Sequence, residues 1–145
     1  MSPNLQFHTN ILQVNKSHDS SMTNRTNHEF SDISRLVTEG IQERKGRHIT
    51  HIDLSNIESA AASDFIICEG SSTMQVSAIA DSVRDYLLEH AGIKPYNYDG
   101  YQNSQWIVID YGHTLVHIFL PSERQRYNLE ELWSDAPITE IPDLD

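Results

Sequence analysis

The stretch WIVIDYGHTLVHIF, residues 106–119, constrains the fold of this chain more than any other segment. Two apolar runs flank Tyr111-Gly112-His113-Thr114, which suits a two-residue type II′ turn with glycine in its first position. The predicted hairpin register pairs Tyr111 with Thr114, Asp110 with Leu115, Ile109 with Val116, Val108 with His117, Ile107 with Ile118, and Trp106 with Phe119. A three-residue loop would change these pairs, but the alternation within each strand would remain.

This alternation gives the hairpin two different faces. One face is almost purely core and consists of Ile107, Ile109, Tyr111, Thr114, Val116 and Ile118. The other resembles the centre of a binding patch, with Trp106, Val108, Asp110, Leu115, His117 and Phe119. Asp110 lies diagonal to His117, within reach of long side chains. Two interpretations stay open: this face docks a partner, or a helix of the same domain covers it and Asp110 and His117 form a satisfied buried pair.

Apolar spacing and capping signals predict the elements before the hairpin. Phe30, Ile33, Val37 and Ile41 recur at spacings of three and four residues and form one apolar helical stripe. Ser31 lies near the start of this stripe and is the expected N-cap. Residues 49–54 and 64–68 read as strands, the second of them covered on both faces. Ser72 and Gln75 have capping-box spacing at the start of a second helix, which ends at Gly92.

The remaining elements are short. Residues 95–98 can form an edge strand, and Asn128 with Glu131 signals a short final helix. Strands that alternate with helices in this order predict an α/β domain. We expect a disordered N-terminal arm over residues 1–28, a folded domain over 29–136 and an acidic C-terminal tail over 137–145.

Composition excludes several classes of protein. The formal net charge of −11 argues against direct binding to nucleic acid, because such proteins carry a basic face, whereas a basic protein partner would be attracted. The single cysteine, Cys68, allows no internal disulfide and suits the cytoplasm. No apolar run approaches the roughly 20 residues that span a bilayer, and the N-terminus does not resemble a signal peptide.

No convincing active site is found. Ser71 or Ser72 with His117 and Asp110 has the residue types of a hydrolase triad, but no G-x-S-x-G elbow surrounds either serine. The glycines form no nucleotide-binding fingerprint, and no histidine or cysteine cluster predicts a metal. We therefore expect neither a cofactor nor catalysis. Arg124 and Arg126, beside Tyr127, could form a small basic recognition spot or pair with neighbouring glutamates.

Several motifs together resemble one known family. In chain order these are DFIICEGSS (64–72), QV (75–76), AIAD (78–81), DG (99–100), WIVIDYG (106–112), VHIF (116–119) and ERQRYNLEELWSDA (123–136). They resemble the ribosomal silencing factor, or Iojap, family from about residue 30 to 136. The chain departs from the family at Lys45-Gly46-Arg47-His48, where Lys-Ala and an acidic residue are common, and at Asp99-Gly100, where Glu-Gly is common.

The resemblance implies a mixed five-stranded sheet flanked by helices, similar to nucleotidyltransferases without their catalytic motif. It also implies binding to the universal large-subunit ribosomal protein fourteen (uL14), which blocks joining of the small subunit and represses translation under nutrient limitation. The alternatives to silencing are a role in large-subunit assembly and activity as an unusual nucleotidyltransferase. The free protein is expected to form a homodimer, with no membrane contact and no nucleic-acid contact beyond nearby ribosomal RNA. Carried over, the partner-binding residues are Trp106, Asp110, Tyr111, His117, Phe119, Arg124, Tyr127, Leu132 and Trp133.

Overall fold

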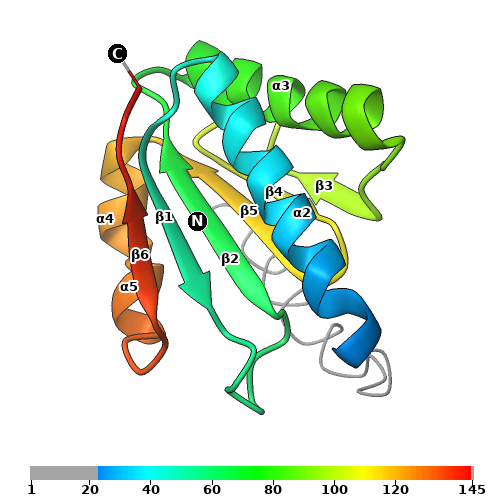
Figure 1. The fold of residues 1–145 in the computed structure, drawn as a ribbon. Coiled ribbons are helices and arrows are strands. Elements are labelled where there is room, and N and C mark those ends of the chain that lie inside the picture. The colour runs from blue at the N-terminus through cyan, green and yellow to red at the C-terminus, as the bar shows by residue number, and fades with distance from the viewer. Residues whose placement is uncertain (1–22, 145) are drawn as a thin grey trace.

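The computed structural model describes residues 23–144, with side chains from residue 32 onward. Helices and a single mixed sheet alternate along the chain (Figure 1). In chain order the elements are α2 (Thr23–Glu43), β1 (Arg47–Asp53), β2 (Asp64–Glu69), α3 (Thr73–Ala91), β3 (Asn97–Asp99), β4 (Trp106–Asp110), β5 (Thr114–Phe119), α4 (Pro121–Tyr127), α5 (Leu129–Leu132) and β6 (Ile138–Ile141).

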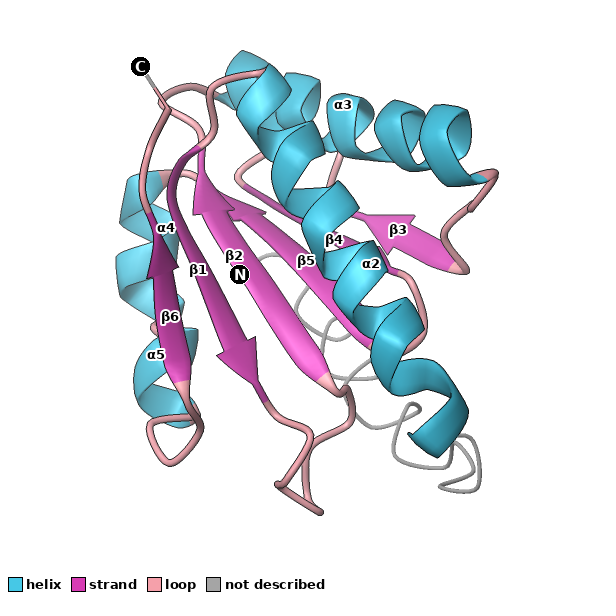
Figure 2. Cartoon of the chain, in the orientation of Figure 1, coloured by secondary structure: helices cyan, strands magenta, loops and turns pink. Residues whose placement is uncertain are grey.

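The sheet is sandwiched between two unequal layers of helix (Figure 2). Its strand order is β3-β4-β5-β2-β1-β6. Only the β2–β5 pair is parallel, and every other neighbouring pair is antiparallel. The long helices α2 and α3 cover one face, and the short helices α4 and α5 lie on the other. The predicted α/β class with a mixed, helix-flanked sheet is therefore confirmed, with six strands instead of five.

The sixth strand comes from the segment predicted as a tail. Residues 138–141 pair antiparallel with β1, from Ile49 opposite Ile141 to Ile52 opposite Ile138. This edge of β1 would otherwise present open backbone groups, which β6 satisfies. The prediction of a tail over residues 137–145 is thus wrong for the part that forms β6, because acidic composition hid a short alternating strand.

Helix α2 begins earlier than its capping signal indicates. It starts at Thr23, so Ser31 lies inside the helix and is not its N-cap. A helix once formed continues until a residue stops it, and residues 23–30 contain neither glycine nor proline. Residues 1–22 of the predicted N-terminal arm lie outside the described residues, whereas residues 23–28 are helical.

Helix α3 follows its sequence signals closely. The Ser72 hydroxyl accepts the N–H of Gln75, and Gly92 ends the helix in the left-handed region with φ of +65°. The Gln75 side chain reaches back to the N–H of Ser71 at 2.6 Å, one residue earlier than an ordinary capping box requires. At the crossing of α2 and α3, a Cβ on Gly40 would lie 2.9 Å from the Cα of Val83. Glycine at this position therefore permits the close approach of the two helices.

Two hydrophobic clusters form, one on each side of the sheet. The first lies under α2 and α3 and includes Val37, Ile41, Ile66, Ile79 and Val83. The second lies on the side of α4 and α5 and includes residues 52, 65, 67, 106, 108, 115, 119 and 129. Strand β2 contributes to both clusters, which confirms that it is covered on both faces. Among the described helices, none is long and apolar enough to cross a membrane.

Candidate functional site

The β4–β5 hairpin has the predicted register. Five pairs run from Trp106 opposite Phe119 to Asp110 opposite Leu115, and the N–H of Tyr111 donates to the carbonyl of Thr114 at 2.9 Å. Gly112 has φ of +93°, a conformation that favours glycine and fits the expected turn. The Asp110 carboxylate accepts the N–H of Gly112 at 2.7 Å, so it shapes the turn.

The first face of the hairpin is core, as predicted. Ile107, Ile109, Val116 and Ile118 pack into the cluster under α2 and α3. Tyr111 belongs to this same cluster and is buried, and burial raises the pKa of its phenol. Tyr111 was placed among the partner-binding residues by family resemblance, and it lies on the face of the sheet opposite α4 and α5.

The second face carries a stack of aromatic rings. The Trp106 ring lies 4.9 Å from Phe119 at an interplanar angle of 22°, and 4.5 Å from Tyr127 at the end of α4. The Trp106 indole N–H donates to Nδ1 of His117 at 3.1 Å. Because Nδ1 accepts this bond, the neutral imidazole carries its proton on Nε2. We call these four residues, Trp106, His117, Phe119 and Tyr127, the aromatic stack.

Helices of the same domain cover this end of the face. Leu129 is buried against the cluster, and the ring of Trp133 meets Phe65 edge-on at 6.1 Å. Trp106 retains only 8% of its exposure, and His117 and Phe119 retain 1% each. Of the two interpretations left open by the sequence, coverage by a helix describes the aromatic stack. The Asp110 carboxylate accepts a hydrogen bond from Gly112, and His117 accepts one from Trp106.

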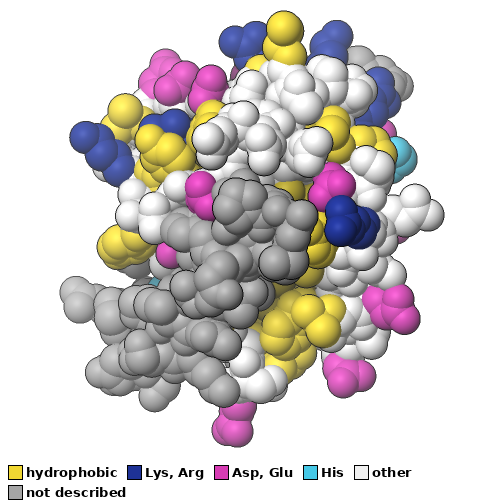
Figure 3. Space-filling model, turned by 180° about the vertical axis from the view of Figure 1, so that it is seen from behind, with side chains coloured by type: hydrophobic (Ala, Val, Ile, Leu, Met, Phe, Trp, Pro, Cys, Tyr) yellow, Lys and Arg dark blue, Asp and Glu magenta, His cyan; other side chains and the backbone are white. Residues whose placement is uncertain are grey.

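The accessible part of this region lies on α4, α5 and the turn that follows. Leu132 is 66% exposed, and Tyr127 and Trp133 are half-buried. Within residues 32–144, the buried indole nitrogen of Trp133 has no hydrogen-bond partner. We call Tyr127, Leu132 and Trp133 the α5 ridge. Figure 3 shows the side of the molecule on which α4 and α5 lie, with hydrophobic side chains at the surface between charged ones.

Acidic side chains surround the α5 ridge. Glu131 and Asp135 are exposed and Glu130 is half-buried. An apolar centre with an acidic rim is suited to a basic protein surface that has an apolar recess. The arrangement therefore offers binding chemistry.

Arg124 forms ion pairs within the domain. Of the two interpretations that the sequence left open for it, a basic recognition spot or pairing with glutamates, the structure shows the pairing. Its guanidinium lies 3.0 Å from Glu130 and 3.1 Å from Glu69. Arg126 differs, because its side chain is 64% exposed and its nearest carboxylate, that of Glu123, is 4.0 Å away. Of this arginine pair, only Arg126 is presented to solvent.

The residue types of a hydrolase triad have other roles. The Ser72 hydroxyl caps α3, and the Ser71 hydroxyl donates to the Gln75 side chain at 2.8 Å. His117 Nδ1 is occupied by Trp106. Among residues 32–144, no cluster of three or more metal-ligating side chains occurs.

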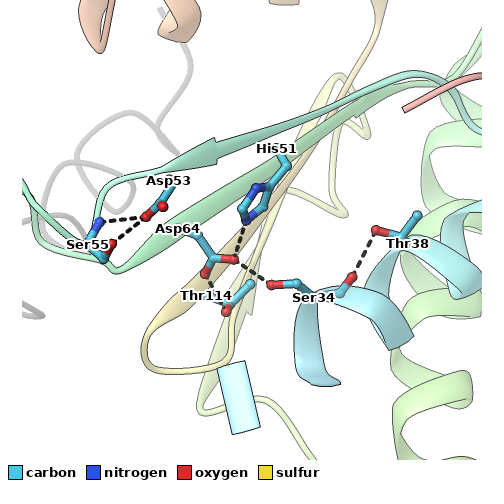
Figure 4. A network of polar contacts seen from close by, with 7 residues as sticks. All are labelled: Ser34, Thr38, His51, Asp53, Ser55, Asp64 and Thr114. Carbon is cyan, nitrogen blue, oxygen red and sulfur yellow. Dashed lines mark hydrogen bonds and ion pairs between the residues drawn. The ribbon is translucent and has the colours of Figure 1, made fainter. Parts of the chain in front are cut away.

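A polar network around Asp64 was missed by the sequence analysis. The Asp64 carboxylate accepts from Ser34 of α2 at 2.5 Å, from Thr114 of β5 at 2.6 Å, and lies 2.8 Å from Nε2 of His51 on β1 (Figure 4). The available signal was an aspartate at the first position of an otherwise apolar buried strand. A buried carboxylate requires such partners, but the sequence does not show which elements supply them.

Comparison with known proteins adds a family match. A family model described as "Ribosomal silencing factor during starvation" matches residues 27–145. "Ribosomal silencing factor RsfS" of Halalkalibacterium halodurans is 36% identical over 110 residues, which cover 76% of this chain and 92% of that protein. "Mitochondrial assembly of ribosomal large subunit protein 1" of Mus musculus is 32% identical over 105 residues, which cover 71% of this chain and 45% of that protein.

Solved structures agree with the fold. A crystal structure of a protein from Chromobacterium violaceum is 35% identical, with a TM-score of 0.68, over 72% of this chain and 85% of that one.

Proposed function

This chain belongs to the ribosomal silencing factor family, and from that premise we propose that it binds the large ribosomal subunit through ribosomal protein uL14. The bound domain occupies part of the face that meets the small subunit. It excludes the small subunit by steric overlap and so represses translation in the cytoplasm under nutrient limitation. This mechanism needs affinity and position, and no chemical step.

The observation that carries the proposal is the exposed Leu132 on a ridge with two half-buried aromatic rings. Exposed apolar patches mark interaction sites, and tyrosine and tryptophan are enriched among binding hot spots. The ridge is held from behind by the aromatic stack, because Tyr127 packs on Trp106. Preorganisation of this kind reduces the entropy that binding would otherwise cost.

The predicted partner-binding residues then divide by role. In this proposal the α5 ridge touches the partner directly. Trp106 acts by packing on Tyr127, His117 and Phe119 act by packing on Trp106, and Asp110 acts by shaping the hairpin turn. The acidic rim complements the basic surface that ribosomal proteins present to solvent. The family resemblance further predicts a homodimer of the free protein, which light scattering measures.

Sedimentation of purified ribosomal subunits tests the proposal. Large and small subunits are mixed with and without the protein at a magnesium concentration that allows joining. We expect the protein to travel with the large subunit and the joined peak to fall. If the protein travels with neither subunit and the joined peak is unchanged, the proposed function is wrong.

Substitutions then locate the surface. Leu132→Ala and Trp133→Ala should each weaken large-subunit binding, and loss of an aromatic anchor typically costs at least about 2 kcal/mol, roughly 30-fold in affinity. Leu88→Ala is the matched control, because Leu88 is a 48% exposed leucine on α3. If the folded Leu132→Ala and Trp133→Ala variants bind the large subunit normally, the α5 ridge is not the binding surface.

A role in large-subunit assembly is the second candidate. It is favoured by the similarity to the mouse protein whose name records assembly of the mitochondrial large subunit. The two roles differ in the particle that is bound. Pull-down of the tagged protein followed by analysis of the ribosomal RNA separates them, because precursor RNA indicates assembly and mature RNA indicates silencing.

A further inference from the structure

Helices α4 and α5 have few fully buried apolar side chains, although the half-buried Tyr127 and Trp133 pack on the second hydrophobic cluster. Helix α4, which the structure describes in full, buries none of its side chains, and α5 buries only Leu129. Most helices are held to their domain by an apolar stripe. The position of α4 and α5 therefore also depends on polar contacts, and these helices carry the α5 ridge.

Arg124 supplies such contacts. Its Nε donates to Glu130 at 3.0 Å, and its Nη1 donates to the His48 carbonyl at 2.6 Å and to Glu69 at 3.1 Å. Its Nη2 donates to the Thr50 hydroxyl at 2.9 Å. One side chain on α4 thus reaches β1, β2 and α5. The side chain is only 12% exposed.

The chemistry of this site requires arginine. A guanidinium has five N–H donors in a rigid fork, and the contacts above occupy four of them. A lysine would keep the charge, but its single ammonium could not span acceptors on three elements. Without the cation, the carboxylates of Glu69 and Glu130 would lose the charge between them.

We propose that Arg124 is a positioning residue, which clamps α4 and α5 to strands β1 and β2 so that the α5 ridge has a fixed place. In this role Arg124 does not contact the partner, in contrast to its place among the partner-binding residues carried over from the family. The effect on ribosome binding rests on the proposed function. The clamp itself is a property of the free protein and is measured without ribosomes.

Amide hydrogen exchange by NMR on the free protein tests the clamp. The reporters are the N–H of Asn128, bonded to the Arg124 carbonyl, and the N–H of Trp133, bonded to the Leu129 carbonyl. In Arg124→Ala we expect protection at both to fall roughly tenfold or more, as for the loss of a charged hydrogen-bond partner. In Arg124→Lys, protection at both amides should lie between that of the wild-type chain and that of Arg124→Ala. The N–H of Gly70, bonded to the Phe119 carbonyl in the sheet, should change little.

Arg126→Ala is the matched control, because Arg126 lies on the same helix and is exposed. It should leave both reporters unchanged. Glu69→Gln with Glu130→Gln in the Arg124→Ala background should recover part of the protection, because the two carboxylates no longer repel. Unchanged reporters in Arg124→Ala would overturn the proposal, and so would an equal loss at Gly70, which would mean a global role.

Ribosome binding provides the second readout. Arg124→Ala should weaken large-subunit binding strongly in the wild-type chain and weakly in the Leu132→Ala background, because both changes act through the α5 ridge. If the losses of binding free energy in Arg124→Ala and Leu132→Ala add fully, and amide protection at Asn128 and Trp133 is unchanged, Arg124 contacts the partner directly. That result would refute the clamp. Failure of the wild-type chain to bind large subunits would refute the proposed function and leave the exchange result standing.

Discussion

The Nε2 atom of His51 lies 2.8 Å from an Asp64 carboxylate oxygen that also accepts the Ser34 hydroxyl. The Asp64 side chain is almost fully buried, whereas His51 is partly exposed. The network joins the middle of α2 to β1, β2 and β5 (Figure 4). The hydrogen bond and the charge of Asp64 raise the pKa of His51 above 6.5, against the opposing effect of burial.

This raised pKa predicts a pH dependence of stability. A folded-state pKa above the unfolded value means that His51 contributes its full stabilisation below pH 6.5 and loses it as pH rises through the raised pKa. Urea unfolding at a series of pH values measures the effect. His51→Gln should remove the part of the slope that lies in this window. His90→Gln, on the exposed last turn of α3, is the control and should retain the slope.

Replacement of Trp106 should act mainly through stability. The ring is buried between Phe119 and Tyr127, so Trp106→Ala should cost about 3–5 kcal/mol in unfolding free energy. Trp106→Phe retains most of the stacking and should cost less. Chemical denaturation with circular dichroism measures both. A Trp106→Ala protein of full stability that has lost binding would place Trp106 in direct contact with the partner.

Gly100 and Gly92 provide a matched pair of backbone tests. Both have positive φ, but a Cβ on Gly100 would collide with the backbone carbonyl of Trp106, whereas a Cβ on Gly92 meets open space. Gly92→Ala should therefore cost about 1 kcal/mol, from conformation alone. Gly100→Ala should cost clearly more and disturb the start of β4. Equal costs in thermal unfolding would contradict this account of Gly100.

Cys68 should be inert in the native protein. It is fully buried in β2, and burial strongly raises the pKa of its thiol. Reaction with a thiol reagent therefore requires opening of the sheet. Because it is the single cysteine, the labelling signal is unambiguous. We expect slow labelling that accelerates in denaturant, and labelling within seconds under native conditions would show that β2 is not covered on both faces.

Local patterns in the sequence carried much of this fold. The hairpin register followed from one glycine turn and a period of two, because both signals act between residues close in the chain. The caps of α3 at Ser72 and Gly92 are local in the same way. Even so, the predicted N-cap at Ser31 was wrong, because the residues before it are also helical and α2 begins at Thr23.

Tertiary structure decided what the local patterns left open. Whether the Trp106 face is covered depended on α4 and α5 folding back over the sheet. The partners of Asp64 come from α2, β1 and β5, and those of Arg124 come from β1, β2 and α5. A polar side chain has the same appearance in the sequence whether it meets water, a partner or its own domain. The sequence by itself determined the hairpin, its turn and the family, whereas long-range packing decided that β6 joins the sheet, that Trp106 is covered and that Leu132 reaches solvent.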